Sequence, residues 1–410
     1  MRRNLNRNTT LFLAATLLYG FSFSVWNLFF NLYILSLGYS NDLLGLIRSA
    51  TPLAALVLSL PLGMLSDRIG RRRSMLIGLV VGFVGMVLQV QVLNPYFIFA
   101  AGLLTGAGFM LHRISQSPFI MSASKEENQA LVFSLNFGLL TAAATVGNLV
   151  AGQLPERLEV WLGLAQGSAA SYQWVIMAGI AVATTSLIPI FLIKRDQMRG
   201  RVKPDRVPIQ QALRKLAARP VVRQLALINL LVGLGAALLI PYLNVFLKDK
   251  FAISDDLLGL LFSMMSALVF IGSLIAPLLV KKTRSRIVPA VASEGISLLF
   301  LFILGFSPFL WLASISLLFR AVFMQLSIPL LDNFTMLISE PEERGTINSV
   351  REMGWQSGQV VGIFVSGLVQ TRFGFSPLFI STGVLYATAL TLTWVFFRPR
   401  EKAIPYAGRR

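Results

Sequence analysis

The sequence predicts an all-α integral membrane protein with 12 transmembrane helices in two pseudo-symmetric halves of six helices each. Three observations predict this fold: the composition, the length of the apolar runs, and an internal repeat. Of the 410 residues, 55% are hydrophobic and 13% are charged, whereas a soluble domain has about 45–50% apolar and about 25% charged residues. This composition excludes a soluble enzyme and a disordered protein.

The apolar residues fall in twelve runs of about 20 residues, the length at which a helix crosses a hydrocarbon core of about 30 Å. The predicted spans are 11–37, 43–64, 74–93, 97–121, 131–153, 172–193, 222–246, 257–280, 287–306, 309–337, 346–369 and 377–397. The first run is too long for the apolar core of a signal peptide and eleven others follow it. We therefore expect it to remain in the protein as the first helix.

The basic residues indicate the orientation of the chain. If the N-terminus is cytoplasmic, 28 of the 36 Lys and Arg residues lie on the cytoplasmic side, four lie outside and four lie within spans. This bias predicts that both termini are cytoplasmic in the plasma or inner membrane. It also accounts for the net charge of +18 through topology and anionic lipid headgroups. We therefore expect membrane lipids, and no nucleic acid, among the partners.

The two halves of the chain resemble each other in sequence. The segment SNDLLGL at 40–46 recurs as SDDLLGL at 254–260, an offset of 214 residues. At an offset of 215, three residues of the first half match three of the second: Ser134, Gly147 and Gly152 match Ser349, Gly362 and Gly367. A constant offset near half the chain length indicates two six-helix repeats, and parallel repeats place a substrate site near the membrane midplane between them.

The repeat and the basic segment rich in proline between its copies give the predicted domain organisation. We predict an N-terminal half at 1–195, a cytoplasmic linker at 196–221, a C-terminal half at 222–398 and a cytoplasmic tail at 399–410.

The loop after the second span reads GMLSDRIGRRR at 63–73. It resembles the G-x-L-x-D-R-x-G-R-[KR]-x signature of the major facilitator superfamily, at the place where that family carries it. The resemblance implies a conformational gate that holds the cytoplasmic ends of the helices together and stabilises the outward-open state. Its residues would be Gly63, Asp67, Arg68, Gly70, Arg71 and Arg72.

By the same resemblance, Asp67 would lie at the positively polarised N-terminus of a neighbouring helix, expected to be the eleventh. Arg71 and its neighbours would pair with nearby acidic residues. The alternative is that the arginines of this loop only anchor the topology.

Two departures from family patterns bear on the substrate. The family often has an arginine early in the fourth span, where this chain has AGLLTG at 101–106. Drug antiporters of the family carry a G-x8-G-x3-G-P-x2-G-G pattern in the fifth span. Here Gly138 and Gly147 have that spacing, but Ala151-Gly152 replaces Gly-Pro. This departure weakens the hypothesis of a drug antiporter. Close packing of helices is the alternative explanation for these glycines.

Ionisable residues within spans are costly and are therefore candidates for function. Arg113 lies roughly 12 Å from the cytoplasmic end of the fourth span at about 1.5 Å per residue. We predict that it faces a central cavity and binds an anionic group of the substrate. Gln116 shares its helix face, whereas the neighbouring His112 is offset by about 100°. The alternative is that Arg113 pairs with Asp332 or Glu352 as a structural gate.

The acidic residues of the second half suggest proton coupling. Asp332 and Arg351 lie at matching depths, so we expect an ion pair between them, with Arg351 part of the conformational gate. Glu352 projects about 100° away from Arg351. A poorly solvated carboxylate exchanges protons near neutral pH, which makes Asp332 and Glu352 the candidates for proton coupling. Glu294, in the ninth span, is expected to pack against an Arg or Ser of a neighbouring helix.

Amide and aromatic side chains complete the predicted substrate-binding set. Besides Arg113, Gln116 and His112, the set comprises Asn27, Asn31, Asn244, Trp355, Gln356 and Gln359. A cavity with these groups suits a small organic anion or amphipath. Clustered oxygen or nitrogen ligands are lacking, so no metal is expected, and no cofactor is expected either.

The sequence therefore predicts a secondary active transporter of a small organic solute, anionic or amphipathic, working by alternating access as a monomer and coupled to protons. The alternative is a multidrug or lipophilic-compound efflux pump of the same fold. A non-transporting sensor or a lipid flippase is a third reading. An enzyme is not expected, because the chain has one histidine, no cysteine and no nucleotide-binding loop.

Overall fold

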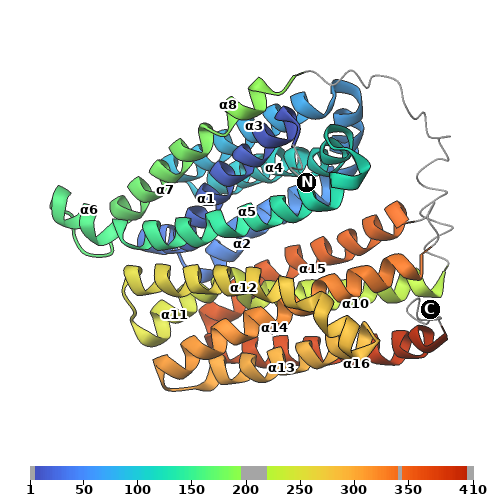
Figure 1. The fold of residues 1–410 in the computed structure, drawn as a ribbon. Coiled ribbons are helices and arrows are strands. Elements are labelled where there is room, and N and C mark those ends of the chain that lie inside the picture. The colour runs from blue at the N-terminus through green and yellow to red at the C-terminus, as the bar shows by residue number, and fades with distance from the viewer. Residues whose placement is uncertain (1–4, 195–218, 340–343, 404–410) are drawn as a thin grey trace. The chain divides into compact units, whose positions relative to one another are not determined.

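The protein is all-helical throughout the part of the chain that the structure describes. The computed structural model describes residues 5–194, 219–339 and 344–403 (Figure 1). The predicted linker, 196–221, lies almost entirely outside these residues. The predicted tail, 399–410, begins as helix, and its part from 404 onward lies outside them too.

The first part of the chain forms eight helices. They are α1 (Arg7–Ser36), α2 (Asn41–Ile69), α3 (Arg71–Gln91), α4 (Pro95–Ala123), α5 (Glu126–Gly152), α6 (Leu154–Leu162), α7 (Ala169–Thr184) and α8 (Leu187–Leu192). The second part forms a short 3-10 helix and seven α-helices. They are α10 (Pro220–Leu239), η1 (Ile240–Tyr242), α11 (Leu243–Phe251), α12 (Asp255–Thr283), α13 (Ile287–Phe306), α14 (Leu310–Leu337), α15 (Arg344–Phe373) and α16 (Ser376–Ala403).

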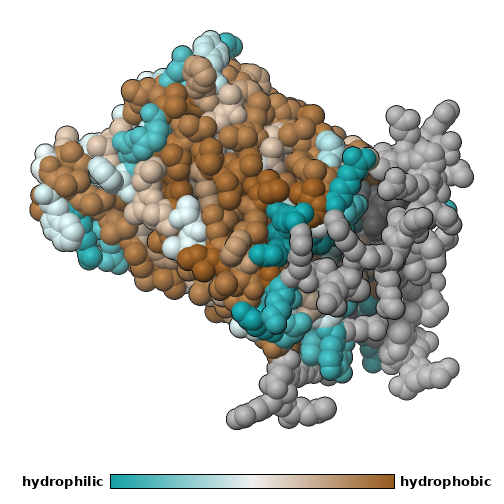
Figure 2. Space-filling view, turned by 90° about the horizontal axis from the view of Figure 1, so that it is seen from above, coloured by the Kyte–Doolittle hydropathy of each residue, from teal (hydrophilic) through white to brown (hydrophobic). Residues whose placement is uncertain are grey.

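The helices are long and apolar enough to cross a membrane at eleven places among the described residues. The predicted eleventh span, 346–369, is the exception: α15 has 30 residues but is too polar to meet that criterion. Large apolar side chains lie on the surface, including Val57 and Leu274 at 64% and 60% exposure. Figure 2 shows hydrophobic residues over most of one face, with hydrophilic residues toward its edges. Such a surface suits contact with lipid.

Two predicted spans are broken in the structure. The sixth, 172–193, is divided between α7 and α8 at Thr185 and Ser186. The seventh, 222–246, is divided by η1, whose central residue is Pro241. Proline lacks a backbone N–H and its ring disturbs the preceding helical turn, so Pro241 accounts for the second break.

The described residues form two compact units, each continuous in space but not in sequence. Unit 1 comprises residues within Met1–Lys203 and Tyr242–Ser266, and unit 2 comprises residues within Pro204–Pro241 and Ala267–Arg410. The break at Pro241 is therefore also the point at which the chain passes from unit 2 to unit 1. The predicted halves, 1–195 and 222–398, stay a prediction.

Unit 1 packs through closely approaching helices. In unit 1, α4 packs on α2 and α3, and α1 packs on α5 and α7. A Cβ atom on Gly78 of α3 would lie 2.6 Å from the carbonyl oxygen of Gly108 of α4. Small residues at such contacts let helix backbones approach each other and replace the hydrophobic driving force that lipid does not supply.

Unit 2 is organised around α10, against which α15 and α16 pack. Its apolar core includes Ile228, Phe334 and Phe397. Polar side chains of α15 donate to backbone carbonyls of α10: Gln359 Nε2 to Gly233 at 2.9 Å, and Ser366 Oγ to Leu238 at 2.6 Å. These bonds explain part of the polarity of α15, because they satisfy polar groups inside the helix bundle.

Sequence signals fix several helix ends. The two copies of the repeated heptapeptide begin α2 and α12, in equivalent local positions. Gly70 separates α2 from α3 with φ of 90° and ψ of 151°, a conformation open in practice only to glycine. The glycine of the signature loop is therefore required by the sharp turn between the two helices.

Candidate functional site

Arg113 lies in the middle of α4 and is exposed. Its guanidinium lies within electrostatic range of the Tyr19 hydroxyl on α1. The Tyr19 ring stacks on Phe23 at 5.6 Å between ring centroids and meets the Phe109 ring edge-on at 5.6 Å. Gln116, one turn further along α4, is half-buried. Unit 1 thus presents a cation and a group of aromatic rings at the depth where we predicted a binding residue.

His112, the neighbour of Arg113, faces the interior of unit 1. Its side chain is buried, with Nδ1 3.4 Å from the carbonyl oxygen of Met75 on α3. Its backbone lies against Gly78, where a Cβ atom would meet the His112 nitrogen at 2.6 Å. The His112 ring therefore packs against α3 and, at 5.6 Å between ring centroids, against the Tyr19 ring of α1 that also adjoins Arg113.

Asn31 and Asn244 come together in unit 1. Both are buried, Asn31 donates to Asn244 Oδ1 at 3.0 Å, and Asn244 donates to the carbonyl of Leu28 at 2.7 Å. The two amides therefore join α1 to α11. Asn27 instead donates to the carbonyl of Phe23 in its own helix at 2.9 Å.

In unit 2, Arg351 Nη2 lies 2.7 Å from Asp332 Oδ1, which confirms the expected ion pair. The Arg351 side chain is 14% exposed and the Asp332 side chain is 51% exposed, so the arginine is the more buried partner. Glu352 accepts a hydrogen bond from Gln356 Nε2 at 2.9 Å, one turn further along α15.

The remaining predicted residues of α15 lie against α10. The backbone of Trp355 and the side chain of Gln359 both contact α10 at Gly233. The Asp332–Arg351 and Glu352–Gln356 pairs thus bring predicted polar residues of unit 2 together.

Glu294, the other acidic residue within the spans of unit 2, lies beside the Ser327 hydroxyl of α14, which donates to the carbonyl of Met324 at 2.9 Å. This contact is the packing role we predicted. Nearby, the buried Arg320 is hydrogen-bonded to Tyr386 on α16. These four side chains join α13, α14 and α16 within unit 2.

The signature loop forms a local network in unit 1. Arg71 Nη2 lies 2.5 Å from Asp67 Oδ1 one turn earlier, and Arg71 Nη1 donates to Ser66 Oγ at 3.0 Å. Ser66 in turn bonds Ser115 of α4 at 2.8 Å. Arg72 donates to the carbonyls of Ile190 and Phe191 at the end of α8, where a cation stabilises the helix dipole.

Further residues of the loop have simpler surroundings. Arg68 is exposed, and Gly63 has no atom of a neighbouring residue where a Cβ would lie. The partner of Asp67 within unit 1 is Arg71. The contact of Asp67 with the eleventh span stays a prediction.

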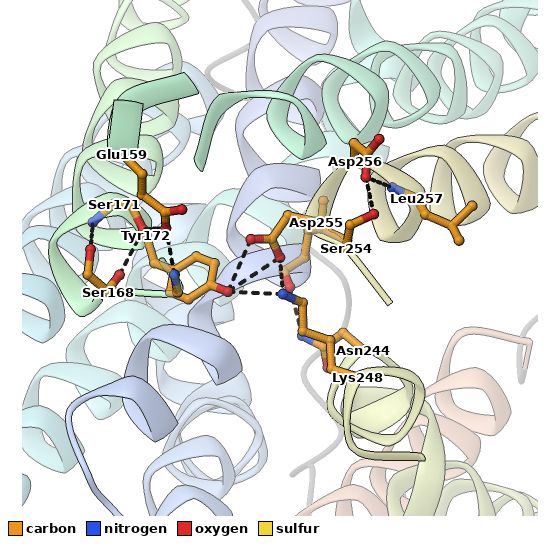
Figure 3. A network of polar contacts seen from close by, with 12 residues as sticks. Glu159, Ser168, Ser171, Tyr172, Asn244, Lys248, Ser254, Asp255, Asp256 and Leu257 are labelled. Carbon is orange, nitrogen blue, oxygen red and sulfur yellow. Dashed lines mark hydrogen bonds and ion pairs between the residues drawn. The ribbon is translucent and has the colours of Figure 1, made fainter. Parts of the chain in front are cut away.

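Figure 3 shows a polar network in unit 1 that the sequence analysis missed. The carboxylate of Asp255, at the start of α12, lies 2.5 Å from Lys248 Nζ at the end of α11. The hydroxyl of Tyr172 on α7 donates to Asp255 Oδ2 at 3.1 Å and accepts from Lys248 Nζ at 3.2 Å. One signal was present: Asp255 stands in the second heptapeptide where Asn41 stands in the first.

Arg48 on α2 is a further cation within a predicted span, 43–64. It is half-buried, with its guanidinium 5.8 Å from the centre of the Phe30 ring. Phe30 stacks on Trp26 at 4.2 Å. A cation over an aromatic face is attracted by the ring's electron density.

The long apolar helices and the charged side chains placed within them define a multi-pass membrane protein of the transporter class. The model of the Major Facilitator Superfamily matches residues 11–231 and 225–409. The chain belongs to that family. This confirms the resemblance that the loop at 63–73 indicated.

Two relatives come from Bacillus subtilis (strain 168), both described as uncharacterized MFS-type transporters. YhjO is 23% identical over 372 residues, which cover 89% of this chain and 86% of that protein. YfkF is 35% identical over 97 residues, which cover 23% of this chain and 25% of that protein.

Solved transporter structures share the fold. A bacterial homologue of the human lysosomal transporter Spinster has a TM-score of 0.76 at 14% identity, covering 96% of each chain. The nucleoside transporter NupG has a TM-score of 0.72 at 14% identity, covering 95% of this chain and 98% of that one. A D-xylose-proton symporter has a TM-score of 0.71 at 15% identity, covering 98% of each chain. At such identities the likeness establishes the fold alone.

Proposed function

We propose that this protein is a secondary active transporter that moves a small organic solute, anionic or amphipathic, by alternating access. In this proposal α15, the predicted eleventh span, also crosses the membrane, which makes twelve spans in all. The two sequence halves, 1–195 and 222–398, rock about a site near the membrane midplane. The protein works as a monomer, surrounded by membrane lipids, in the plasma or inner membrane with both termini cytoplasmic. The distribution of Lys and Arg supports this orientation.

The exposed position of Arg113 is the observation that carries the proposal. Arg113 is ten residues from Ala123, the last residue of α4, which puts it about 15 Å along the helix from that end. An arginine at this depth is costly against lipid. It is stable where it faces water or an anionic group, so a solute-filled cavity gives this residue a function.

The rings beside Arg113 suggest the rest of the substrate. Tyr19, Phe23 and Phe109 form one aromatic group next to the guanidinium. A ligand that combines a negative charge with an apolar body would contact both. The same rings would also suit a lipophilic drug, which keeps the efflux pump as the second candidate.

Proton coupling is part of the proposal and is assigned to Glu352 or Asp332. One solved structure of this fold is a D-xylose-proton symporter, so the fold is compatible with coupling. Glu352 is the stronger candidate, because Asp332 already has the Arg351 guanidinium as its counter-charge. A carboxylate held by a guanidinium keeps its negative charge, whereas a proton carrier must lose and regain its own.

A thermal-shift panel on the purified protein tests the substrate class. The panel compares organic anions, lipophilic cations and neutral sugars on the wild type, Arg113→Ala and Arg113→Lys. A ligand present at 100 times its dissociation constant stabilises by about 2.7 kcal/mol. We expect stabilisation by an anion that is lost in Arg113→Ala and weakened in Arg113→Lys, since lysine lacks the bidentate geometry of arginine.

Arg372→Ala is the matched control, because Arg372 is an exposed arginine at the end of α15. It should respond to the same anions as the wild type. Stabilisation only by lipophilic cations would replace the anion transporter with the efflux pump. An anion effect that survives Arg113→Ala would remove Arg113 from the binding site.

A further inference from the structure

We propose that Tyr172, Lys248 and Asp255 form a clasp that holds the external side of the transporter closed. The hydrogen bonds of the Tyr172 hydroxyl are the ones that break when this side opens. We call these three residues the Tyr172 clasp (Figure 3). The inference rests on the proposed function, since closing one side of the protein has a purpose only in alternating access. It assigns that closure to particular atoms.

The clasp joins parts of the chain that are far apart in sequence. Tyr172 belongs to the first predicted half, and Lys248 and Asp255 belong to the second. In the structure, the segment Tyr242–Ser266 forms part of unit 1 together with the first-half helices. If the two sequence halves rock apart, this segment must leave α1, α5 and α7. The contacts it makes there are therefore the ones that hold the closed state.

The clasp lies at the helix ends that the orientation places outside. Tyr172 is in the first turn of α7, and Asp255 is the first residue of α12. With a cytoplasmic N-terminus, both of these helices begin on the external side. Asn31 of α1, bonded to Asn244 of α11 at 3.0 Å, lies five residues before Ser36, at the external end of its own helix.

The bonds of the clasp differ in what happens when it opens. The ion pair between Lys248 and Asp255, with an N–O distance of 2.5 Å, lies within the second half and persists. The Tyr172 hydroxyl bonds both of these groups, at 3.1 and 3.2 Å, from the first half. Opening the external side breaks the bonds of the Tyr172 hydroxyl and leaves the ion pair in place.

The burial of Asp255 makes the crossing bond effective. Asp255 is 4% exposed, so its carboxylate depends on protein donors in the closed state. A hydrogen bond to a charged group is stronger than one between neutral groups. Tyr172 is itself held in place, because its ring stacks on Phe29 of α1 at 5.5 Å between centroids.

Close backbone packing adjoins the clasp and leaves few side chains to interlock. A Cβ atom on Gly259 of α12 would lie 2.6 Å from Gly152 Cα of α5. Ser263 Oγ donates to the carbonyl of Thr145 at 2.7 Å. Helices α5 and α12 meet here through glycines, so they can separate without changes of side-chain rotamer. Hydrogen bonds and ion pairs therefore supply much of the interaction that holds the closed state.

The repeat shows that the Lys248–Asp255 ion pair of the clasp occurs in the second half only. At the offset of 214 residues, Asp255 corresponds to Asn41 and Lys248 corresponds to Ile34. The first half therefore lacks the ion pair. The clasp is a feature of this external face rather than a consequence of the internal symmetry.

A cysteine reporter tests the clasp without any substrate. The chain has no cysteine, so Val245→Cys introduces the single thiol. Val245 is 6% exposed in α11. A membrane-impermeant maleimide added to intact cells labels it only when the external side opens. We expect Tyr172→Phe, which keeps the ring stack and removes the hydroxyl, to accelerate labelling about tenfold.

Tyr96→Phe is the matched control, since Tyr96 begins α4 outside the clasp and is 76% exposed. Its labelling rate should equal that of the Val245→Cys parent. An unchanged rate in Tyr172→Phe, with correctly folded protein on size-exclusion chromatography, overturns the proposal.

A double variant separates the clasp from general loosening. If Tyr172 acts through Asp255, Tyr172→Phe combined with Asp255→Asn labels no faster than the faster single variant. Multiplication of the two effects would mean independent destabilisation and would contradict the clasp. The labelling assay contains no substrate. A negative result in the ligand panel therefore does not affect the test of the clasp, and a negative result in the labelling assay does not affect the test of the substrate class.

Discussion

Glu352 and Asp332 are carboxylates on neighbouring helices with different partners. Glu352 is bonded to the Gln356 amide, whereas Asp332 is bonded to the Arg351 guanidinium. If Glu352 carries the proton, Glu352→Gln abolishes accumulation driven by a pH gradient while leaving exchange of labelled for unlabelled substrate. We expect the exchange rate of Glu352→Gln to stay within about threefold of the wild type, because the substrate site is untouched.

Asp332→Asn is the comparison for this prediction. It leaves Arg351, the less exposed partner, without its counter-charge. It should lower stability and slow both accumulation and exchange. If Asp332→Asn instead abolishes accumulation alone, the proton-coupling assignment moves from Glu352 to Asp332.

The estimated depth of each residue in the membrane was enough to predict the ion pair between Asp332 and Arg351. Asp332 and Arg351 are adjacent because equal distances from one membrane face bring charges together. Whether an amide side chain lines a cavity depends on how its helix is rotated about its own axis. The distance of a residue from the membrane face does not determine that rotation. Asn31 and Asn244 bond each other and His112 packs on α3, and their role in substrate binding stays a prediction.

The signature segment 63–73 contains two glycines whose replacement should have opposite effects. Gly70 has φ of 90° and ψ of 151°, so Gly70→Ala is expected to cost about 1–3 kcal/mol in backbone strain. Gly63 lies within α2 with no neighbouring atom in the place of a Cβ. Gly63→Ala should stabilise by about 0.4–1 kcal/mol.

Thermal unfolding of the purified variants measures this difference. The order expected from the lowest to the highest Tm is Gly70→Ala, wild type, Gly63→Ala. A lower Tm for Gly63→Ala would mean that a partner approaches this position in another conformation of the protein. That result would support a gate role for Gly63 itself.

At the element scale, the apolar runs located the long helices but not their interruptions. Pro241 indicates the break at η1, but the predicted span 222–246 includes this proline without an interruption. The amphipathic α6 is too short to be predicted as a span. The polarity of α15 has a tertiary cause, since Gln359 and Ser366 bond carbonyls of α10, and no local pattern reveals that.

For the whole molecule, the signature loop and the Tyr172 clasp are expected to favour opposite states. The family resemblance implies that Asp67 stabilises the outward-open state, and the clasp would stabilise a state closed to the outside. Asp67→Asn should therefore slow maleimide labelling of Val245→Cys, by about threefold for the loss of a largely exposed pair. Tyr172→Phe should accelerate it.

The double variant Asp67→Asn with Tyr172→Phe measures whether both act on one equilibrium. Its labelling rate should equal the product of the two single effects relative to the parent, because distant sites add in free energy. Faster labelling in Asp67→Asn alone would contradict the assigned direction of the loop.

The overall architecture was the most predictable property of this chain, because lipid forces every spanning segment to satisfy its backbone internally. The helices and the family could be predicted from apolar runs and one loop. The grouping of Tyr242–Ser266 with first-half helices could not. It rests on contacts between segments that are far apart in the sequence, which no local pattern reports.

The burial of His112 has a practical consequence for experiments on pH. It is the only histidine, and the chain has no cysteine, so no other side chain has a usual pKa between pH 5 and 8. Its ring is enclosed against Met75. A transport rate that changes across this range therefore reports an unusual carboxyl group or the ionisation of the solute. Comparing an ionisable solute with a permanently charged analogue would tell these two apart in a single titration.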